Sequence, residues 1–338
     1  MGMIRKVCIN TVVAIMLLSQ TFVAVGSKPV AEDIKYLARN KPHEAIKEFE
    51  KVAKQLLGQN NTETILIYKD VLIAASSTKN MPLVEQIVEL LSAPRLESYI
   101  TAYLFVVTNA IGVAYRRNGQ FDEAISTYKC TFKYAFNDID KMTVKVNLAI
   151  AYRMKQQPAI SFQLLQSIDE AILNGNRKAG LLVVKGNTAV VLGKAQDAVK
   201  FFSEARNYYL KVQHKRSAAR VTVNLLGAAL ISRKLDIFDH YRAKLAGLPD
   251  DYLPDSDLAY LAWLDLMHES VVKNTIAADV KSYTIQHVPK LIEYGYVEHV
   301  AQLLESLDAG DLVPKRTAFL LPETKLKSGL GSSWCQDL

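Results

Sequence analysis

The chain has few of the residues that build small cross-linked or irregular proteins: 3 cysteines, 15 glycines and 10 prolines among 338 residues. Three cysteines cannot form a disulfide scaffold or a four-cysteine zinc site. The low glycine and proline content excludes collagen-like and low-complexity architectures. Because 50% of the residues are hydrophobic, the chain has enough apolar surface to bury a core, which excludes a disordered protein.

Motifs that would indicate chemistry are also missing. None of the six histidines forms a His-Glu-x-x-His pair, so a zinc hydrolase is not indicated. The Gly329–Ser333 stretch lacks the strand and helix that flank a nucleophile elbow or a phosphate loop. Asp255 and Asp257 are interpreted as caps of a helix that begins near Leu258, because the other ligands of a calcium loop are absent. The sequence predicts no enzyme, no metal and no cofactor; an enzyme with a site in the C-terminal helices is the alternative.

The first 26 residues have the pattern of a secretory signal. Arg5 and Lys6 precede the apolar run Val7–Leu18, and Ala24-Val25-Gly26 places small residues before a possible cleavage site at Ser27. The alternatives are an uncleaved anchor in the inner membrane and a buried N-terminal helix. The pattern predicts a periplasmic or secreted protein, which is not an integral membrane protein if the signal is cleaved and in which disulfides are allowed.

A repeat of 37 residues is visible in the middle of the chain. Small and apolar residues return in register over three copies between residues 105 and 212. The repeat-defining residues are Gly112, Tyr115, Gly119, Ala124, Tyr128, Ala149, Tyr152, Gly186, Gly193, Ala198 and Phe202.

The spacing within each copy predicts a helical hairpin. Ile111, Gly112 and Tyr115 share one face of a helix, and Gly119 ends that helix. Ala124 and Tyr128 then share the inner face of a second helix. We expect the small residues, Gly112 with Ala124 and their equivalents 149 with 161 and 186 with 198, to let the two helices approach closely. One hairpin cannot bury its apolar face alone, so the hairpins must stack.

These residues resemble the tetratricopeptide repeat. The family pattern is matched best by Ile111-Gly112-Tyr115-Gly119-Phe121-Ala124-Tyr128, with weaker matches in the next two copies. The resemblance covers about a third of the chain and implies an all-α fold, a right-handed superhelical α-solenoid of TPR-like helical hairpins. Its period is longer than that of the family.

Weaker helical patterns flank the repeats, and they divide the chain into five parts. These are a signal peptide (1–26), degenerate N-terminal hairpins (27–104), the three repeats (105–212), degenerate C-terminal hairpins (213–311) and an irregular tail (312–338). Trp334 and Cys335 could anchor the tail. A disulfide between Cys335 and Cys130, which lies on a predicted second helix, is allowed in an oxidising compartment, and the sequence leaves its formation open.

Charge is unevenly distributed along the chain. Residues 177–220 hold ten lysines and arginines against two acids, and residues 236–311 hold fourteen acids against five bases. The basic block could bind an anionic partner, its cations could lie on solvated helix faces, or the two blocks could pair with each other. Nucleic acid is disfavoured as a partner by the predicted export.

The resemblance implies a concave groove lined by the first helix of each hairpin. The groove candidates are Asn109, Val113, Arg116, Ile150, Arg153, Asn187 and Asn224, and Val146, Val183 and Val190 share their columns. Asparagine could clamp a peptide backbone, and the arginines could pair with carboxylates. We therefore expect a non-enzymatic exported scaffold that binds a protein or peptide partner, in envelope signalling or assembly. The alternative is an anionic envelope polysaccharide bound by residues 177–220.

Overall fold

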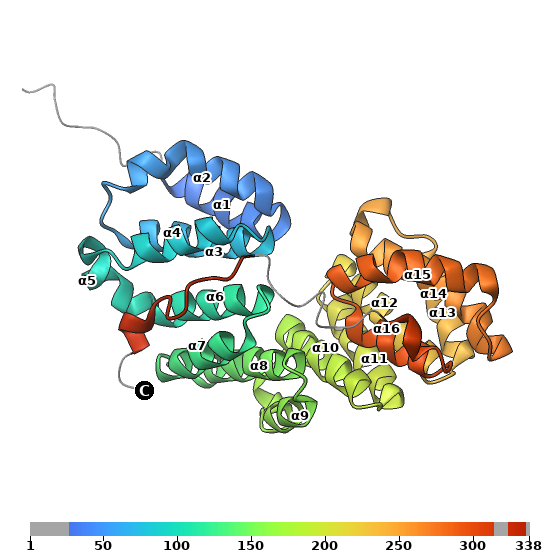
Figure 1. Cartoon of the computed structure of the whole chain (residues 1–338). Coiled ribbons are helices and arrows are strands. Elements are labelled where there is room, and N and C mark those ends of the chain that lie inside the picture. Colours follow the sequence, from blue (N-terminus) through green and yellow to red (C-terminus); the bar gives the residue numbers. More distant parts are fainter. Residues whose placement is uncertain (1–26, 314–323, 336–338) are drawn as a thin grey trace, which may run out of the picture.

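The chain is all-helical throughout the residues that the structure describes. The computed structural model describes residues 27–313 and 324–335, and within them there is no β-strand (Figure 1). This confirms the predicted all-α class. The predicted signal peptide, residues 1–26, lies outside the described residues.

The first half of the chain consists of consecutive helices joined by short turns. Their bounds are α1 Ser27–Asn40, α2 Pro42–Leu56, α3 Thr62–Ser77, α4 Met81–Leu91, α5 Glu97–Ile100, α6 Leu104–Arg117, α7 Phe121–Lys133, α8 Asp138–Met154 and α9 Pro158–Gln166. Three-residue 3₁₀ turns flank α5 and follow α9.

The second half continues the same pattern. Its helices are α10 Gly175–Val191, α11 Ala195–Lys211, α12 Lys215–Ile231, α13 Leu235–Leu245, α14 Asp255–Lys273, α15 Ala278–Glu293 and α16 Val297–Glu305. Each of the three 37-residue copies forms one helix pair, namely α6–α7, α8–α9 and α10–α11.

Helices pack mainly against their neighbours in the chain. The two helices of each repeat pair contact each other, α7 contacts α8, and α11 contacts α12. In Figure 1, α1–α8 fill the left half of the view and α10–α16 the right half, with α9 at the bottom. An exception to the neighbour rule is α16, which lies against α10 and α12.

A residue in the left-handed conformation closes the turn of each repeat pair. Gly119 has φ 77° and Gly193 has φ 69°, as the sequence pattern predicts for a glycine after a helix. Gln156 occupies the same place in the middle repeat with φ 66°. A side chain at that φ is strained, because its Cβ approaches the following carbonyl oxygen. The middle repeat therefore keeps the left-handed turn although Gln156 stands in place of glycine.

A glycine of the first helix faces an aromatic ring of the second helix in two of the pairs. A Cβ added to Gly112 would lie 2.5 Å from Cε1 of Tyr128, and one added to Gly186 would lie 2.4 Å from Cε1 of Phe202. The absence of a side chain at Gly112 and Gly186 thus lets the first helix approach the ring of Tyr128 or Phe202 on the second helix. In the middle pair, Ala149 and the smaller Leu165 lie in one core cluster.

The core is divided along the chain. One large cluster joins α1–α8, and a second joins α10–α16. A small cluster between them includes Ala149, Leu165 and Leu181 from α8, α9 and α10. The two large clusters each belong to one half of Figure 1.

Among the described residues, Pro94–Arg117 is long and apolar enough to cross a membrane by length and composition alone. Half of its most apolar window is buried inside the fold. Val107, Ile111 and Ala114 are fully buried in the N-terminal core cluster. The segment is therefore built into that core.

The end of the chain returns to the first half of the molecule. Residues 324–335, which we call the C-terminal strap, pack against the N-terminal core cluster through Leu326, Leu330 and Trp334. Cys335 in the strap and Cys130 in α7 form a disulfide. The structure thus contains the pairing that the sequence left open.

Candidate functional site

The groove candidates lie on the first helices of successive pairs. Asn109, Val113 and Arg116 are on α6, Ile150 and Arg153 on α8, Asn187 on α10 and Asn224 on α12. Val113 and Ile150 are half-buried and pack against core clusters. The remaining candidates are polar, and most of them already have partners within the chain.

The candidates on α6 bind neighbouring helices. Asn109 Oδ1 accepts a hydrogen bond of 2.8 Å from Asn147 Nδ2 of α8. Arg116 donates to the hydroxyl of Tyr128 at 3.4 Å and approaches the sulfur of Met154. The contacts with Asn147 and Met154 join α6 to the next helix pair, and the contact with Tyr128 joins it to α7.

The groove candidates Arg153 and Asn187 both bind side chains of α16. Arg153 Nη1 lies 2.7 Å from Glu298 Oε1, and both side chains are about 90% buried. Asn187 Oδ1 is 3.1 Å from His299 Nε2. Within the described residues, α16 therefore covers the stretch of the predicted groove that α8 and α10 contribute.

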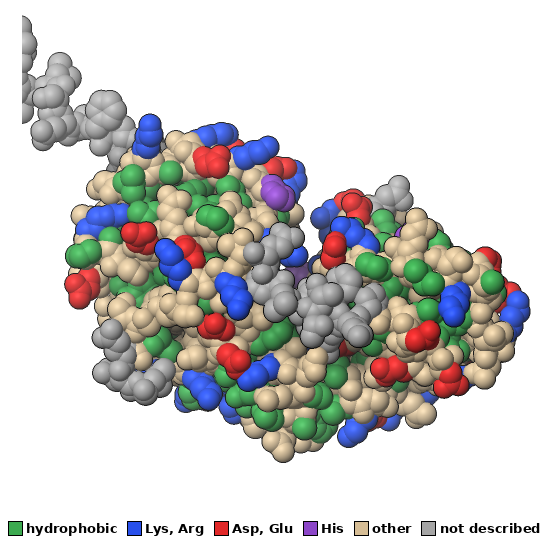
Figure 2. Space-filling view, in the orientation of Figure 1, with side chains coloured by type: hydrophobic (Ala, Val, Ile, Leu, Met, Phe, Trp, Pro, Cys, Tyr) green, Lys and Arg blue, Asp and Glu red, His purple; other side chains and the backbone are tan. Residues whose placement is uncertain are grey.

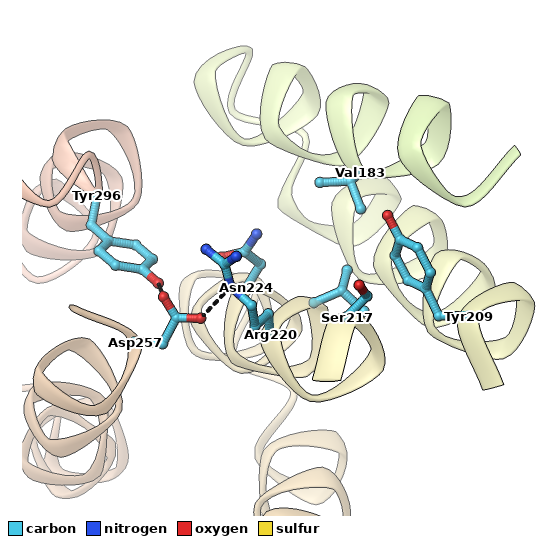
Figure 3. Close-up of a pocket in the computed structure, with 8 residues that line it drawn as sticks. Val183, Tyr209, Ser217, Arg220, Asn224, Asp257 and Tyr296 are labelled. Carbon is cyan, nitrogen blue, oxygen red and sulfur yellow. Dashed lines mark hydrogen bonds and ion pairs between the residues drawn. The ribbon is translucent and has the colours of Figure 1, made fainter. Parts of the chain in front are cut away.

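Beyond α16 the row opens into a cavity. Its volume is about 220 Å³, and Figure 3 shows Asn224 and Val183 beside it, both in the predicted groove columns. The cavity is also lined by Tyr209 of α11, Ser217, Arg220 and Val221 of α12, Asp257 of α14 and Tyr296 before α16.

A chain of hydrogen bonds holds Arg220 at the mouth of this cavity. Asp257 Oδ2 accepts from Arg220 Nε at 3.0 Å, and its Oδ1 accepts from the Tyr296 hydroxyl at 2.8 Å (Figure 3). The Asp257 side chain is only 3% exposed, while that of Arg220 is 61% exposed. The buried carboxylate thus orients the guanidinium through its Nε.

The expectation that Asp255 and Asp257 cap a helix is wrong. Helix α14 begins at Asp255 after Pro254, and no side chain accepts from its first turn. Asp257 lies within that first turn and faces Arg220 and Tyr296 instead. Sequence reasoning missed this role because the partners come from segments 37 and 39 residues away. The sequence signal that could have indicated this role is the opposite charge of residues 177–220 and 236–311, which contain Arg220 and Asp257 respectively.

Three polar side chains at the cavity make no hydrogen bond within the described chain. These are the hydroxyls of Tyr209 and Ser217 and the amide of Asn224. Burial raises the pKa of Tyr209, and burial together with the Asp257 carboxylate raises the pKa of Tyr296. Both phenols are therefore protonated at neutral pH. The cavity presents hydrogen-bond donors and acceptors beside the apolar Val183 and Val221, a combination typical of a binding pocket.

The size and chemistry of the cavity suit part of a ligand. It is smaller than the roughly 300–1,000 Å³ of sites that enclose a whole drug-sized molecule. In residues 27–313 and 324–335, no three histidine, cysteine or acidic side chains are grouped so that they could hold a metal ion. The residues present are equipped to bind a polar group and one side chain.

Half of the ten cations in residues 177–220 form ion pairs. Lys178 and Lys185 both contact Glu170, and Lys200 contacts Asp197. Arg216 contacts Asp251, and Arg220 contacts Asp257, so the basic and acidic blocks meet in two ion pairs. Figure 2 shows basic and acidic side chains interspersed over the face in view.

The chain matches no protein-family model, no curated protein and no solved structure.

Proposed function

We propose that this protein is an exported, non-enzymatic scaffold of tetratricopeptide-like hairpins that binds a protein partner. The hairpins would form a right-handed superhelical solenoid, and the partner would place a peptide segment along its inner row. Stacked helix pairs, left-handed residues at the turns and close glycine contacts support this interpretation. Such arrays expose extended surfaces for recognition.

The observation that carries the proposal is the cavity at Asn224. It lies where the inner row is not covered by α16, and the polar groups of Tyr209, Ser217 and Asn224 have no partner within the described chain. These three side chains are half-buried at the cavity wall. A peptide segment that enters the cavity would supply hydrogen bonds to them and cover Val183.

An anionic polysaccharide is a weaker proposal. Five of the ten cations in residues 177–220 have ion pairs within the chain, which lowers the charge available to a polyanion. Recognition of a polyanion depends on several unpaired cations on one face. The cavity beside Asn224 offers a single guanidinium, already bound by Asp257 on one side.

The disulfide supports the proposed export. Stable disulfides are rare in a reducing cytosol and common in the periplasm and outside the cell. Cys130 and Cys335 are 205 residues apart in sequence and are joined across a packed interface. Together with the signal-like first 26 residues, they favour a periplasmic or secreted protein.

Site-specific photo-crosslinking tests the proposed binding. A photoreactive residue at Ser217, inside the cavity, should crosslink a defined partner in an envelope extract. The same residue at Lys200, exposed on α11 and outside the cavity, is the matched control. Asn224→Ala should abolish the Ser217 crosslink, while Arg216→Gln, which breaks an exposed ion pair about two turns from Asn224, should not.

The outcomes separate the alternatives. A crosslink from Lys200 but not from Ser217 would reject the cavity as the partner site. Binding that falls steeply with salt, and equally in Arg216→Gln and Asn224→Ala, would instead favour the basic block and a polyanion.

A further inference from the structure

The C-terminal strap lies in a trench between α4 and α7 that crosses α6. It contacts Glu85 of α4, Ile111 and Tyr115 of α6, and Cys130 of α7. In Figure 1 the strap is the dark red segment that runs through the left half of the molecule, far from the red helices that precede it in sequence. The trench is therefore filled by a segment distant in sequence from all of its walls.

The trench binds the main chain of the strap through side chains. Gln120 pairs with both backbone groups of Leu326, accepting from its N–H at 2.8 Å and donating to its C=O at 3.1 Å. The Tyr115 hydroxyl donates to the carbonyl of Lys327 at 2.6 Å and accepts from the N–H of Leu330 at 2.9 Å. These contacts hold the extended backbone of residues 325–327 and the start of the turn at 328–331 that follows it.

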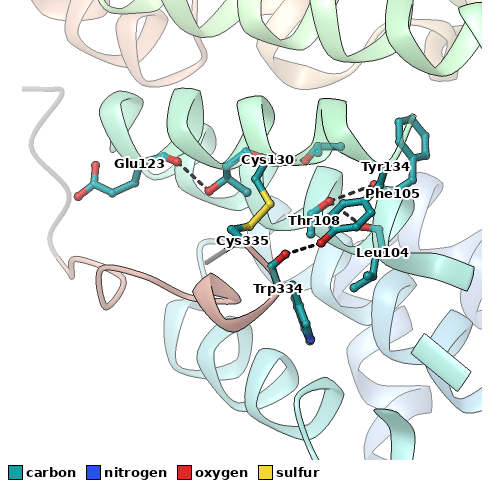
Figure 4. Close-up of a disulfide and its surroundings, with 10 residues drawn as sticks. Leu104, Phe105, Thr108, Glu123, Cys130, Tyr134, Trp334 and Cys335 are labelled. Carbon is teal, nitrogen blue, oxygen red and sulfur yellow. Dashed lines mark hydrogen bonds between the residues drawn. A yellow bond between two sulfur atoms is a disulfide. The ribbon is translucent and has the colours of Figure 1, made fainter. Parts of the chain in front are cut away.

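Three further side chains continue this pattern. Asn118 donates to the carbonyl of Thr324 at 3.0 Å, and Glu85 accepts from the N–H of Lys327 at 2.7 Å. Tyr134 donates to the carbonyl of Trp334 (Figure 4). Asn118 also donates to Gln120, so the amide that holds Leu326 is itself oriented. Both amide side chains belong to buried residues, and they would lose hydrogen bonds if the trench were empty.

Apolar positions of the strap enter the trench every four residues. Leu326 is 2% exposed, and Leu330 and Trp334 pack against the same core cluster. At Gly331 an added Cβ would be 3.0 Å from both Ile111 Cδ1 and the Trp334 ring, so the strap passes close to α6 there. These contacts favour a ligand with large apolar side chains at four-residue intervals.

The strap does not fill the trench. A cavity of about 110 Å³ remains between Leu330 and Cys335 of the strap and Tyr115, Glu123 and Thr127 of the wall. This pocket opens to the surface, so the edge of the strap is accessible beside Cys335.

We propose that this trench is a peptide-binding site whose resident ligand is the strap, and that the Cys130–Cys335 disulfide is the latch. The opened trench binds a segment of a partner protein that follows the path of the strap, extended and then turning into a 3₁₀ helix, with leucine, leucine and tryptophan at four-residue intervals. This site is separate from the cavity at Asn224. Hydrogen bonds to the ligand's main chain supply affinity, and the trench's apolar contacts with its leucine and tryptophan side chains select the sequence that binds.

The latch opens by thiol–disulfide exchange with a protein or small-molecule dithiol. A thiolate of the dithiol attacks the sulfur of Cys335, which is half-buried, and expels the thiolate of Cys130, which is fully buried. The second thiol of the reductant then displaces Cys335 and closes the reductant's own disulfide. Two electrons pass from the dithiol to the protein, and with two protons both cysteines become thiols.

The test keeps every part of the chain. A recognition sequence for a specific protease is inserted between residues 314 and 323, and the folded protein is cut there. The strap then stays attached only by the disulfide and its non-covalent contacts. The probe is a fluorescent peptide of residues 324–335 with Cys335→Ser, and its binding is measured by anisotropy with and without dithiothreitol.

We expect the probe to bind the cut protein only after reduction, because the tethered strap otherwise has a high effective concentration. Gln120→Ala should weaken binding about tenfold, the value of about one to two hydrogen bonds. Gln196→Ala, on the exposed surface of α11, should leave it unchanged. A probe with Leu326→Asp should not bind.

Three results would overturn the inference. The first is a reduced, cut protein that binds no probe and keeps its strap through gel filtration. The second is loss of tertiary structure, seen in the near-ultraviolet circular dichroism, when the strap is released, since the strap would then be part of the core. The third is equal binding of the native and Leu326→Asp probes. In the uncut chain, reduction must also speed hydrogen exchange in residues 324–335 while leaving α10–α13 unchanged.

Discussion

Arg153 in α8 and Glu298 in α16 form a buried ion pair, with Nη1 and Oε1 2.7 Å apart. The pair attaches α16 to the inner row of first helices at a residue that sequence reasoning had offered to a partner. His299, the next residue, reaches Asn187 of α10 at 3.1 Å. A single turn of α16 thus bridges the two halves of the helical array.

Removal of Arg153 should destabilise the protein strongly. Arg153→Met takes away the cation that faces Glu298 in a buried setting, which costs about 3–5 kcal/mol of unfolding free energy. The double variant Arg153→Met with Glu298→Met should recover most of this loss, since an apolar pair replaces the charges. Urea unfolding measures both. Lys51→Met, which breaks the exposed pair with Glu48, should change stability by less than about 1 kcal/mol.

Acid should destabilise the protein through His299. Burial, aided by the Arg153 cation and opposed by Glu298, lowers the pKa of His299 to about 4. In the unfolded chain the histidine takes up a proton near its ordinary pKa of about 6.5. The unfolded state therefore binds more protons between these values, and stability falls as the pH drops from about 6.5 to about 4, by up to about 3 kcal/mol.

The variant His299→Gln keeps an N–H donor for Asn187 and cannot titrate. Its unfolding free energy should change less between pH 6.5 and pH 4 than that of the unmodified protein. An identical pH profile for both proteins would show that His299 does not govern the acid response.

Because Gly112 lies so close to the Tyr128 ring, we expect the fold to tolerate poorly even a methyl group added at position 112. Gly112→Ala should lower stability by about 1–3 kcal/mol because its Cβ would overlap the ring. Adding Tyr128→Leu should restore part of the loss, since the middle repeat combines alanine with leucine at these two positions. Gly180→Ala, where nothing lies within 4 Å of the added Cβ, should raise stability by up to about 1 kcal/mol. Thermal unfolding ranks the variants.

The strained turn at Gln156 predicts a stabilising substitution. Its φ is 66°, and Gln156→Gly removes a left-handed penalty of about 1–2 kcal/mol, less the greater freedom of glycine in the unfolded chain. We expect a net gain of up to about 1 kcal/mol in urea unfolding. Gly193→Ala, at φ 69° with open space around it, should have the opposite effect. Equal stabilities of all three proteins would contradict the assignment of strain to this turn.

The three repeated helix pairs could be predicted from the sequence, since the 37-residue period placed α6–α11. This succeeds because each helix pair buries its apolar face against its immediate neighbours, so the pattern is local. That Gly112 faces the Tyr128 ring could not be read from the pattern, because ring size acts only in the packed pair.

The candidate site could be predicted in part. Asn224 and Val183 lie at the cavity as members of the groove columns, while Arg153 and Asn187 are covered by α16. Asp257 was misjudged because a carboxylate near a helix start has the same sequence appearance whether it caps the helix or pairs with an arginine of another helix.

The sequence by itself determined the all-α class, the repeating hairpins and the opposed charge of two blocks, because periodic apolar residues encode contacts between neighbours. Only the tertiary structure decided where α16 and the C-terminal strap lie and that Cys130 is bonded to Cys335. Glu85 and Lys327 meet across 242 residues of chain, and no local period specifies such a contact. It depends on the fit between one unrepeated segment and a surface that exists only once the helices have packed.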